Sequence, residues 1–216
     1  MNIDSLLRTY YPQDVPSPTI EVFDDGNVYE VFSHIVKLLY GHIDIEIGVL
    51  QALHYCFYEI LDNVLVHSGK KCGTAIQSYD AERGLIKILV ADDGIGIAGS
   101  LRQNEKYKGI TELQAVEQCV KDTVTDGKGM GFGLYSTACL VKYAGVLLEI
   151  RSGKARLRFD GGKTISDENG DWKGTLVYIE LDARREINPN NVVDNRTDCE
   201  SQFNETFSNE DFENLW

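Results

Sequence analysis

Three segments of this sequence carry polar or glycine residues at spacings that could do chemistry. In the first, Glu59, Asn63 and His67 recur at every fourth position. On a helix these side chains form one stripe, because about 3.6 residues make a turn. A carboxylate on such a stripe can act as a base, and an amide oxygen suits a hard cation such as Mg²⁺. A solvated polar face that ends in a capping histidine would show the same pattern, so the stripe alone leaves both interpretations open.

The second segment, Asp92–Gly96 (DDGIG), directly follows the apolar run Leu85–Ala91. A carboxylate at the buried end of a strand is costly unless a hydrogen-bond donor meets it, and the exocyclic amine of adenine is one suitable donor. Gly94 and Gly96 have no side chains, which lets a flat ring approach the backbone. The alternative is an ordinary Asp-Gly turn.

The third segment, Gly127–Leu134 (GKGMGFGL), opens a predicted helix. Glycines ahead of a helix N-terminus allow several backbone N–H groups to point at phosphate oxygens. Lys128 is followed by Gly129 and not by Ser or Thr, which excludes a Walker P-loop. No strand directly precedes the segment, which argues against a dinucleotide-binding turn. A merely flexible loop is the alternative here.

Taken in this order, the segments resemble the motifs of the gyrase, chaperone, histidine-kinase and mismatch-repair (GHKL) ATPase superfamily. Glu59–His67 is similar to the N box of that family, Asp92-x-Gly94-x-Gly96 to its first glycine box, and Gly129-x-Gly131-x-Gly133-Leu134 to its second. Gly174-Thr175 resembles the late threonine beside the adenine-binding aspartate. The resemblance covers residues 28–182 and implies the Bergerat fold, with ATP and Mg²⁺ as ligands.

The resemblance also implies a role for each matching residue. Glu59 would be the catalytic base, and Asn63 would coordinate Mg²⁺. Asp92 would accept a hydrogen bond from the adenine amine, supported by Thr175 directly or through water. Residues 98–128 would form a mobile lid over ATP. The other matches would line the base pocket (Gly94, Gly96) or wrap the phosphates (Lys128, Gly129, Gly131, Gly133, Leu134).

Three functional classes fit these motifs. The spacing Glu-x-x-x-Asn-x-x-x-His and the run GMGF at 129–132 are similar to those of anti-sigma-factor serine kinases, whereas Gly133-Leu134 follows the histidine-kinase form. The first class is therefore a serine/threonine kinase that acts on a regulatory protein partner. The second is a slow ATPase switch that signals by lid closure, and the third is a nucleotide-sensing adaptor module. Glu59 argues against a pure sensor, which needs no base.

Composition narrows the partners and the location. The chain has 216 residues and a formal net charge of −13, so general attraction to nucleic acid or to an anionic membrane is not expected. No run reaches the ~18 apolar residues that span a bilayer, and the N-terminus lacks a signal-peptide pattern. The scattered cysteines favour reduced thiols over a disulfide frame or a zinc site. We therefore expect a cytoplasmic protein.

Hydrophobic periodicity predicts the elements that position these residues. Helices are predicted at 28–40, 44–67, 111–122 and 132–143, and strands at 19–23, 73–79, 85–91, 146–151, 154–159 and 174–181. This order predicts an α+β two-layer sandwich, with helices on one face of a mixed, mostly antiparallel sheet. We divide the chain into an N-terminal arm (1–27), an ATP-binding domain (28–182) and an acidic tail (183–216) that we expect to be disordered.

Two surfaces are candidates for contact with other proteins. One is the acidic and aromatic end of the chain, residues 202–216, which would suit a basic apolar groove, although a solvated low-complexity tail has the same composition. The other is an apolar face of residues 1–40 that would suit a homodimer. Its members are Leu6, Leu7, Tyr10, Val31, Ile35 and Leu38.

Overall fold

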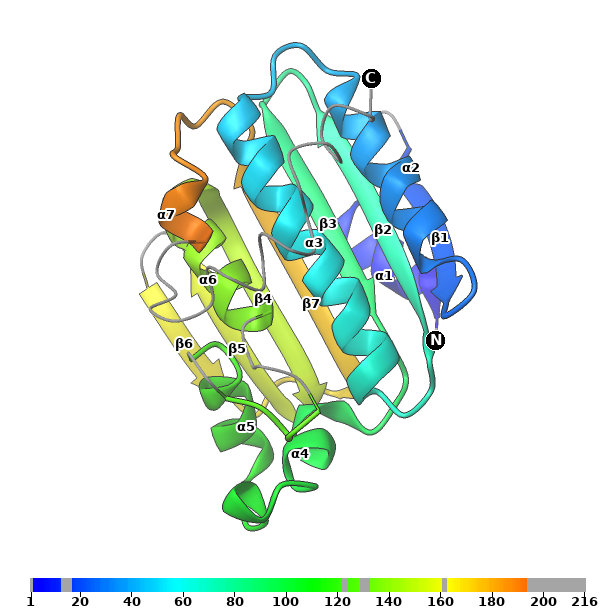
Figure 1. Cartoon of the computed structure of the whole chain (residues 1–216), viewed down its shortest axis with the longest axis vertical. Helices are drawn as coiled ribbons and strands as arrows, with labels where there is room; N and C mark the ends of the chain where they lie inside the picture. Colours follow the sequence, from blue (N-terminus) through cyan, green and yellow to red (C-terminus); the bar gives the residue numbers. More distant parts are fainter. Residues whose placement is uncertain (1, 13–16, 122–123, 129–132, 161–162, 194–216) are drawn as a thin grey trace.

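The computed structural model describes residues 2–12, 17–121, 124–128, 133–160 and 163–193 (Figure 1). These residues form a seven-stranded sheet in the order β1-β2-β3-β7-β4-β5-β6. The strands are β1 (Thr19–Asp24), β2 (Cys72–Asp80), β3 (Leu85–Ala91), β4 (Gly145–Gly153), β5 (Ala155–Asp160), β6 (Lys163–Asp167) and β7 (Trp172–Asp182). The predicted α+β sandwich is confirmed, with the refinement that every described strand pair is antiparallel.

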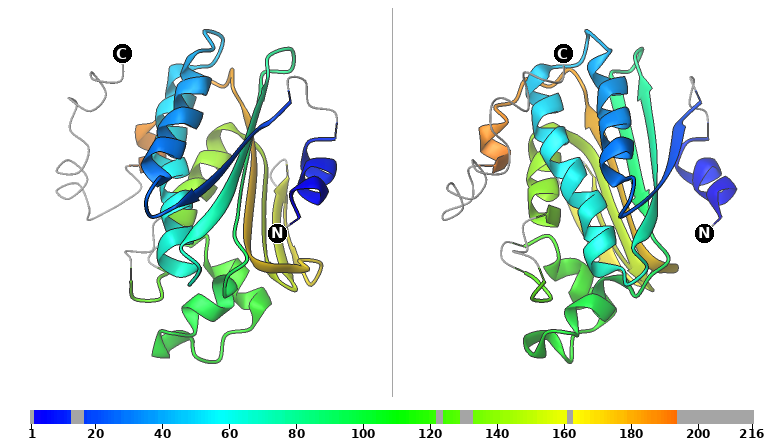
Figure 2. Two further views of the ribbon diagram at one scale, coloured as in Figure 1. Left: turned by 90° about the vertical axis from the view of Figure 1, so that its right-hand side faces the viewer. Right: turned by 45° about the vertical axis from the view of Figure 1, so that its right-hand side comes forward.

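Most of the helices cover one face of this sheet, as Figures 1 and 2 show. They are α2 (Val28–Tyr40), α3 (Ile47–His67), α4 (Gly96–Leu101), α5 (Glu112–Gln118), α6 (Gly133–Ala144) and α7 (Asn190–Val193), with a 3₁₀ turn at Glu105–Tyr107. Helix α1 (Ile3–Tyr10) lies on the opposite face (Figure 2). The periodicity predicted α2, α3 and α6 to within a few residues, but it did not predict α4, β6 or α7.

Strand β3 shows how both faces of the sheet are filled. Its residues alternate in direction, so Ile86, Ile88 and Val90 join the main core while Leu89 and Ala91 face the other way. The main core lies between the sheet and α3, which contributes a continuous apolar stripe that includes Val49, Leu53, Phe57, Ile60, Leu61 and Val64. A strand buried on both faces ends at Ala91, and this places the following Asp92 at the edge of the core.

Helix α1 forms a second, smaller core on the other face of the sheet. Leu6 and Tyr11 are buried there, and the Tyr11 hydroxyl donates to the Ile76 carbonyl over 2.9 Å.

On the helical face, Val31 and Ile35 of α2 are at most 5% exposed. These residues pack inside their own chain, so the prediction that they belong to an uncovered dimer face is wrong.

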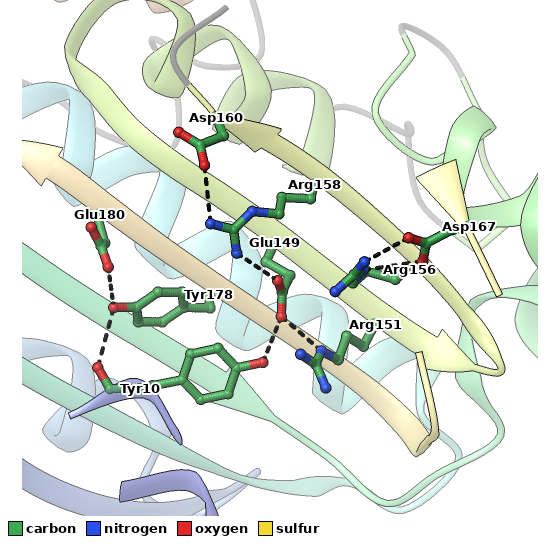
Figure 3. A network of polar contacts seen from close by, with 9 residues as sticks. All are labelled: Tyr10, Glu149, Arg151, Arg156, Arg158, Asp160, Asp167, Tyr178 and Glu180. Atoms are coloured by element: carbon green, nitrogen blue, oxygen red, sulfur yellow. Dashed lines mark hydrogen bonds and ion pairs between the residues drawn. The ribbon is translucent and has the colours of Figure 1, made fainter. Parts of the chain in front are cut away.

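A buried carboxylate connects α1 to the sheet (Figure 3). Glu149 on β4 is 1% exposed and accepts hydrogen bonds from the Tyr10 hydroxyl (2.7 Å), Arg151 Nε (2.7 Å) and Arg158 Nη1 (3.1 Å). The Tyr10 ring also lies against that of Tyr178 on β7, with centroids 4.5 Å apart. Burial by itself would raise the pKa of Glu149, but the bonds from Tyr10, Arg151 and Arg158 outweigh it and lower the pKa.

Two further properties bear on the predictions from composition. None of the described helices is long and apolar enough to cross a membrane. Among the described residues, Cys56, Cys72, Cys119 and Cys139 form no disulfide bond.

We predict that Glu149→Gln lowers the free energy of unfolding at pH 7 by about 2 kcal/mol, since charge-assisted hydrogen bonds contribute about 1.5–3 kcal/mol each. Because the pKa of Glu149 is lowered in the folded protein, its contribution is present above the unfolded pKa and is lost as the pH falls. Urea unfolding should therefore show a gap between variant and native protein that narrows from pH 7 toward pH 3. Glu180→Gln, which removes the charge of the half-buried carboxylate that accepts from Tyr178, is the control and should change stability much less. An equal gap at both pH values would contradict the assignment.

Candidate functional site

The polar stripe of α3 follows the edge of the main core. Glu59 and Asn63 are both half-buried, and the side-chain nitrogen of Asn63 is fully buried without a hydrogen-bond partner among the described residues. Burial and the neighbouring charge of Asp62 raise the pKa of Glu59 to about 7. A carboxyl group with this pKa exchanges its proton near neutrality, which a general base requires.

Asp92 lies at the end of β3, where it is 2% exposed. Its carboxylate accepts from the Gly94 N–H over 2.7 Å and from both the backbone and the hydroxyl of Thr175 on β7. Burial raises the pKa of Asp92 to about 6, although these bonds pull it down. A carboxylate offers about four acceptor positions, so three donors leave about one for an outside group.

Two glycines of this segment allow backbones to approach closely. A Cβ at Gly94 would lie 2.1 Å from the Ser68 carbonyl oxygen, which accepts from Ile95 N–H just after α3 ends. Gly174 has a φ of +93°, and a Cβ there would lie 2.3 Å from the carbonyl oxygen of Asp92. The end of α3 therefore packs against one side of the Asp92 segment, and the start of β7 packs against the other.

Ser152 and Trp172 hold this segment, and neither role was predicted from the sequence. Ser152 is 3% exposed; its hydroxyl accepts from Ile97 N–H over 2.8 Å and donates to the Gly174 carbonyl over 3.0 Å. The Trp172 indole N–H donates to the Asp92 carbonyl over 3.0 Å. Both residues come from strands more than 50 residues further along the chain. The pairing of β7 with β3 brings Trp172 here, and the pairing of β4 with β7 brings Ser152.

The third motif is only partly described. Gly133 is the first residue of α6, and Leu134 follows it, partly buried against the main core. The Lys128 side chain is 47% exposed, with its ammonium nitrogen 3.9 Å from Asp126. Gly129 and Gly131 lie outside the described residues.

Most of the segment expected to form a lid, residues 98–128, is folded. It contains the end of α4 and the whole of α5, and Ala115 and Val116 of α5 are buried in the main core. The Glu112 carboxylate also accepts from the Lys154 N–H over 2.9 Å. The mobility of the segment stays a prediction.

Another buried carboxylate joins the first motif, the third motif and helix α4. Asp126 accepts from the Ser100 hydroxyl of α4 over 2.7 Å and lies 2.8 Å from Nδ1 of His67, the last residue of α3. Its other oxygen accepts from the Lys128 N–H over 2.9 Å. Asp126 was not predicted as a site residue, because an Asp-Gly pair in a loop is also typical of an ordinary turn.

The residues fit a magnesium ion that is held mainly by a substrate. No group of three His, Cys, Asp or Glu side chains that could hold a metal occurs among the described residues. Mg²⁺ commonly keeps several waters and takes only one or two protein ligands beside substrate phosphates. Asn63, with its unpaired amide nitrogen and its carbonyl oxygen on the same side chain, is a suitable single ligand.

One comparison with known proteins identifies a family. Residues 48–185 match the family described as histidine kinase-, DNA gyrase B-, and HSP90-like ATPase. The matched range contains all of α3 except Ile47, strands β2 to β7 and every motif residue named so far. Among curated proteins, none matches the chain significantly.

We predict that Gly94→Ala destabilises the protein by at least ~2 kcal/mol, because the new methyl group would overlap a backbone oxygen that cannot move without breaking its bond to Ile95. Gly109→Ala is the matched control, since a Cβ at Gly109 meets nothing within 4 Å. Thermal unfolding of both variants measures the difference. Equal melting temperatures would show that the Asp92 segment is not tightly packed against α3.

Proposed function

Because the chain belongs to the histidine kinase-, DNA gyrase B-, and HSP90-like ATPase family and contains its ATP-binding domain, we propose that it is a Mg²⁺- and ATP-dependent serine/threonine kinase that acts on a protein partner. The observation that supports the proposal most is Glu59, a half-buried carboxyl group with a pKa of about 7, one helical turn before Asn63. A purely structural carboxylate at this position would need a donor, and no hydrogen bond contributes to its pKa among the described residues.

In this proposal, adenine binds at Asp92. The exocyclic amine donates to the acceptor position that Gly94 and Thr175 leave open. Gly94 and Gly96 lie beside the carboxylate and would line the base pocket through their backbone, since a side chain at either position would meet neighbouring protein atoms. The phosphates bind to the second glycine motif, and the backbone N–H groups at the start of α6 point toward them. The residues of this motif that bind them are Lys128, Gly129, Gly131, Gly133 and Leu134.

Asn63 holds Mg²⁺, which neutralises phosphate charge when it is bound. Glu59 takes the proton from a serine or threonine hydroxyl of the partner, and the oxygen forms a bond to the γ-phosphorus as the bond to ADP breaks. With water in place of the hydroxyl, the same residues would perform slow ATP hydrolysis. Experiments must therefore distinguish phosphotransfer to a protein from slow ATP hydrolysis and from nucleotide sensing by an adaptor.

The kinase needs a protein substrate, and the proposal includes a cytoplasmic regulatory partner and a possible homodimer. Exposed apolar residues on the described surface are available for such contacts. Val22 is 61% exposed on the edge strand β1, and Tyr29 is 66% exposed on α2. Neither residue belongs to the nucleotide site. A partner could therefore bind there without covering ATP.

Asp92→Asn should weaken ATP and ADP binding alike, by about 10- to 150-fold, because a charge-assisted hydrogen bond of roughly 1.5–3 kcal/mol is lost. In the native protein, ADP affinity should fall as the pH drops below about 6, since protonation of Asp92 removes the negative charge that strengthens this hydrogen bond. The variant should lack this pH dependence. Titration calorimetry between pH 5 and 8 measures both effects, with Asp93→Asn as the neighbouring control. Unchanged ADP affinity in Asp92→Asn would rule out this adenine site.

Glu59→Gln should keep ATP affinity within about threefold and lower the rate of phosphotransfer or hydrolysis by about 10²- to 10⁴-fold. In the native protein the rate should rise as the pH passes about 7, because Glu59 must lose its proton to act as a base. Asp62→Asn should keep activity and move this inflection to lower pH, because a neighbouring negative charge is removed. Radiolabelled ATP separates phosphotransfer from phosphate release. Full activity of Glu59→Gln would show that Glu59 is not the base, whereas a native protein that binds ATP without either activity would favour the sensing adaptor.

A further inference from the structure

Asp126 is a buried carboxylate that the proposed chemistry does not use. Its side chain is 1% exposed, although it belongs to a loop between α5 and α6. One oxygen receives the Ser100 hydroxyl (2.7 Å) and the His67 ring (2.8 Å), and the other receives the Lys128 N–H (2.9 Å). These partners come from α4, the last turn of α3 and its own loop. Three separate segments therefore meet at one charge.

The charge balance shows that Asp126 is held as an anion. Burial by itself would raise its pKa, but the bonds from Ser100, Lys128 and His67 outweigh burial and lower the pKa. The Lys128 ammonium group adds a weaker attraction from 3.9 Å. With its donors in place the carboxylate is satisfied, whereas loss of one partner would leave a buried charge only partly paired.

The rest of the loop is fixed around this carboxylate. Thr125 accepts from the Asn104 side chain through its carbonyl oxygen (3.3 Å), and its hydroxyl accepts from Gly127 N–H (3.1 Å). Gly127 has a φ of +97°, which a residue with a side chain rarely adopts. Residues 124–128 therefore have a defined conformation, and the direction of the Lys128 backbone is set by Asp126.

His67 connects this loop to the metal-binding helix. It lies on the same stripe of α3 as Glu59 and Asn63, one turn beyond Asn63. Its Nδ1 is occupied by Asp126, which fixes the orientation of the ring. The contact thus holds the end of the stripe at a fixed position relative to Lys128.

We propose that Asp126 is a positioning residue for the phosphates of the nucleotide: by joining His67, Ser100 and Lys128 it orders the phosphate side of the site before ATP binds. This inference rests on the proposed function, because it takes Lys128 and the α3 stripe as the groups that face the phosphates. A preordered site binds more tightly, since ordering does not have to take place during binding. Asp126 touches neither the nucleotide nor the reacting atoms.

The test compares a ligand with phosphates and one without, using the full-length chain. Asp126→Asn keeps the shape of the side chain and removes its charge. We expect it to weaken Mg-ATP binding about 10-fold and to leave adenosine binding within twofold, measured by calorimetry. Asp167→Asn is the matched control, because it removes an ion-paired carboxylate on β6, whose partner is Arg156, and should change neither affinity.

A second set of variants separates positioning from a general loss of structure. His67→Gln and Ser100→Ala should each weaken Mg-ATP binding, and the double variant Asp126→Asn/His67→Gln should be weaker than Asp126→Asn by less than twofold, since the two side chains act through one contact. A purely structural role would instead lower ATP and adenosine affinity equally, together with the melting temperature. That result overturns the inference, and so does tighter ATP binding by Asp126→Asn, which would mean that the carboxylate competes with the phosphates. If the native protein bound no ATP, the proposed function itself would fail.

Discussion

The burial of one carboxylate, Asp92, constrains much of the surrounding structure. A negative charge that is 2% exposed is stable only when donors meet it, and β3 delivers Asp92 to the edge of a core that offers no water. The Gly94 N–H and two groups of Thr175 supply these donors. Thr175 can reach Asp92 only because β7 pairs with β3, although some 80 residues of chain separate the two positions. The insertion of β7 into the centre of the sheet therefore determines the chemistry of the site.

The glycines of the site are a consequence of the same constraint. Helix α3 ends so close to the Asp92 segment that its Ser68 carbonyl leaves no room for a side chain at Gly94. On the other side, Gly174 passes just as closely to the Asp92 backbone. The Ser152 hydroxyl then fills the remaining space, where it accepts from the Ile97 N–H and donates to the Gly174 carbonyl. These glycines are required by packing as much as by any ligand.

The sequence predicted the elements whose periodicity is local and the site residues whose types are distinctive. The stripe of α3 and the apolar run of β3 could be recognised because each signal lies within one element. Helix α4 was not predicted because Gly96 and Gly99 are not typical of a helix. The helix nevertheless forms and buries Ile97 and Leu101. Asp126 and Ser152 were missed for a different reason: their roles depend on contacts between distant segments, and no pattern within a single window records such contacts. The second glycine motif was recognised by resemblance, and part of it lies outside the described residues.

Three carboxyl groups of the site differ in the number of donors that they receive. Asp126 has a donor set that lowers its pKa despite burial, so it stays an anion and works as a fixed connection. Asp92 has donors and about one open acceptor position, with a pKa near 6, so it is ionised at neutral pH and can still bind an outside amine. Glu59 is half-buried next to a negative charge, and no hydrogen bond offsets these two effects. Its pKa therefore rises to about 7. The same side-chain chemistry thus yields a structural anion, a ligand acceptor and an exchangeable proton, because the surrounding backbone gives each group a different share of N–H and O–H donors.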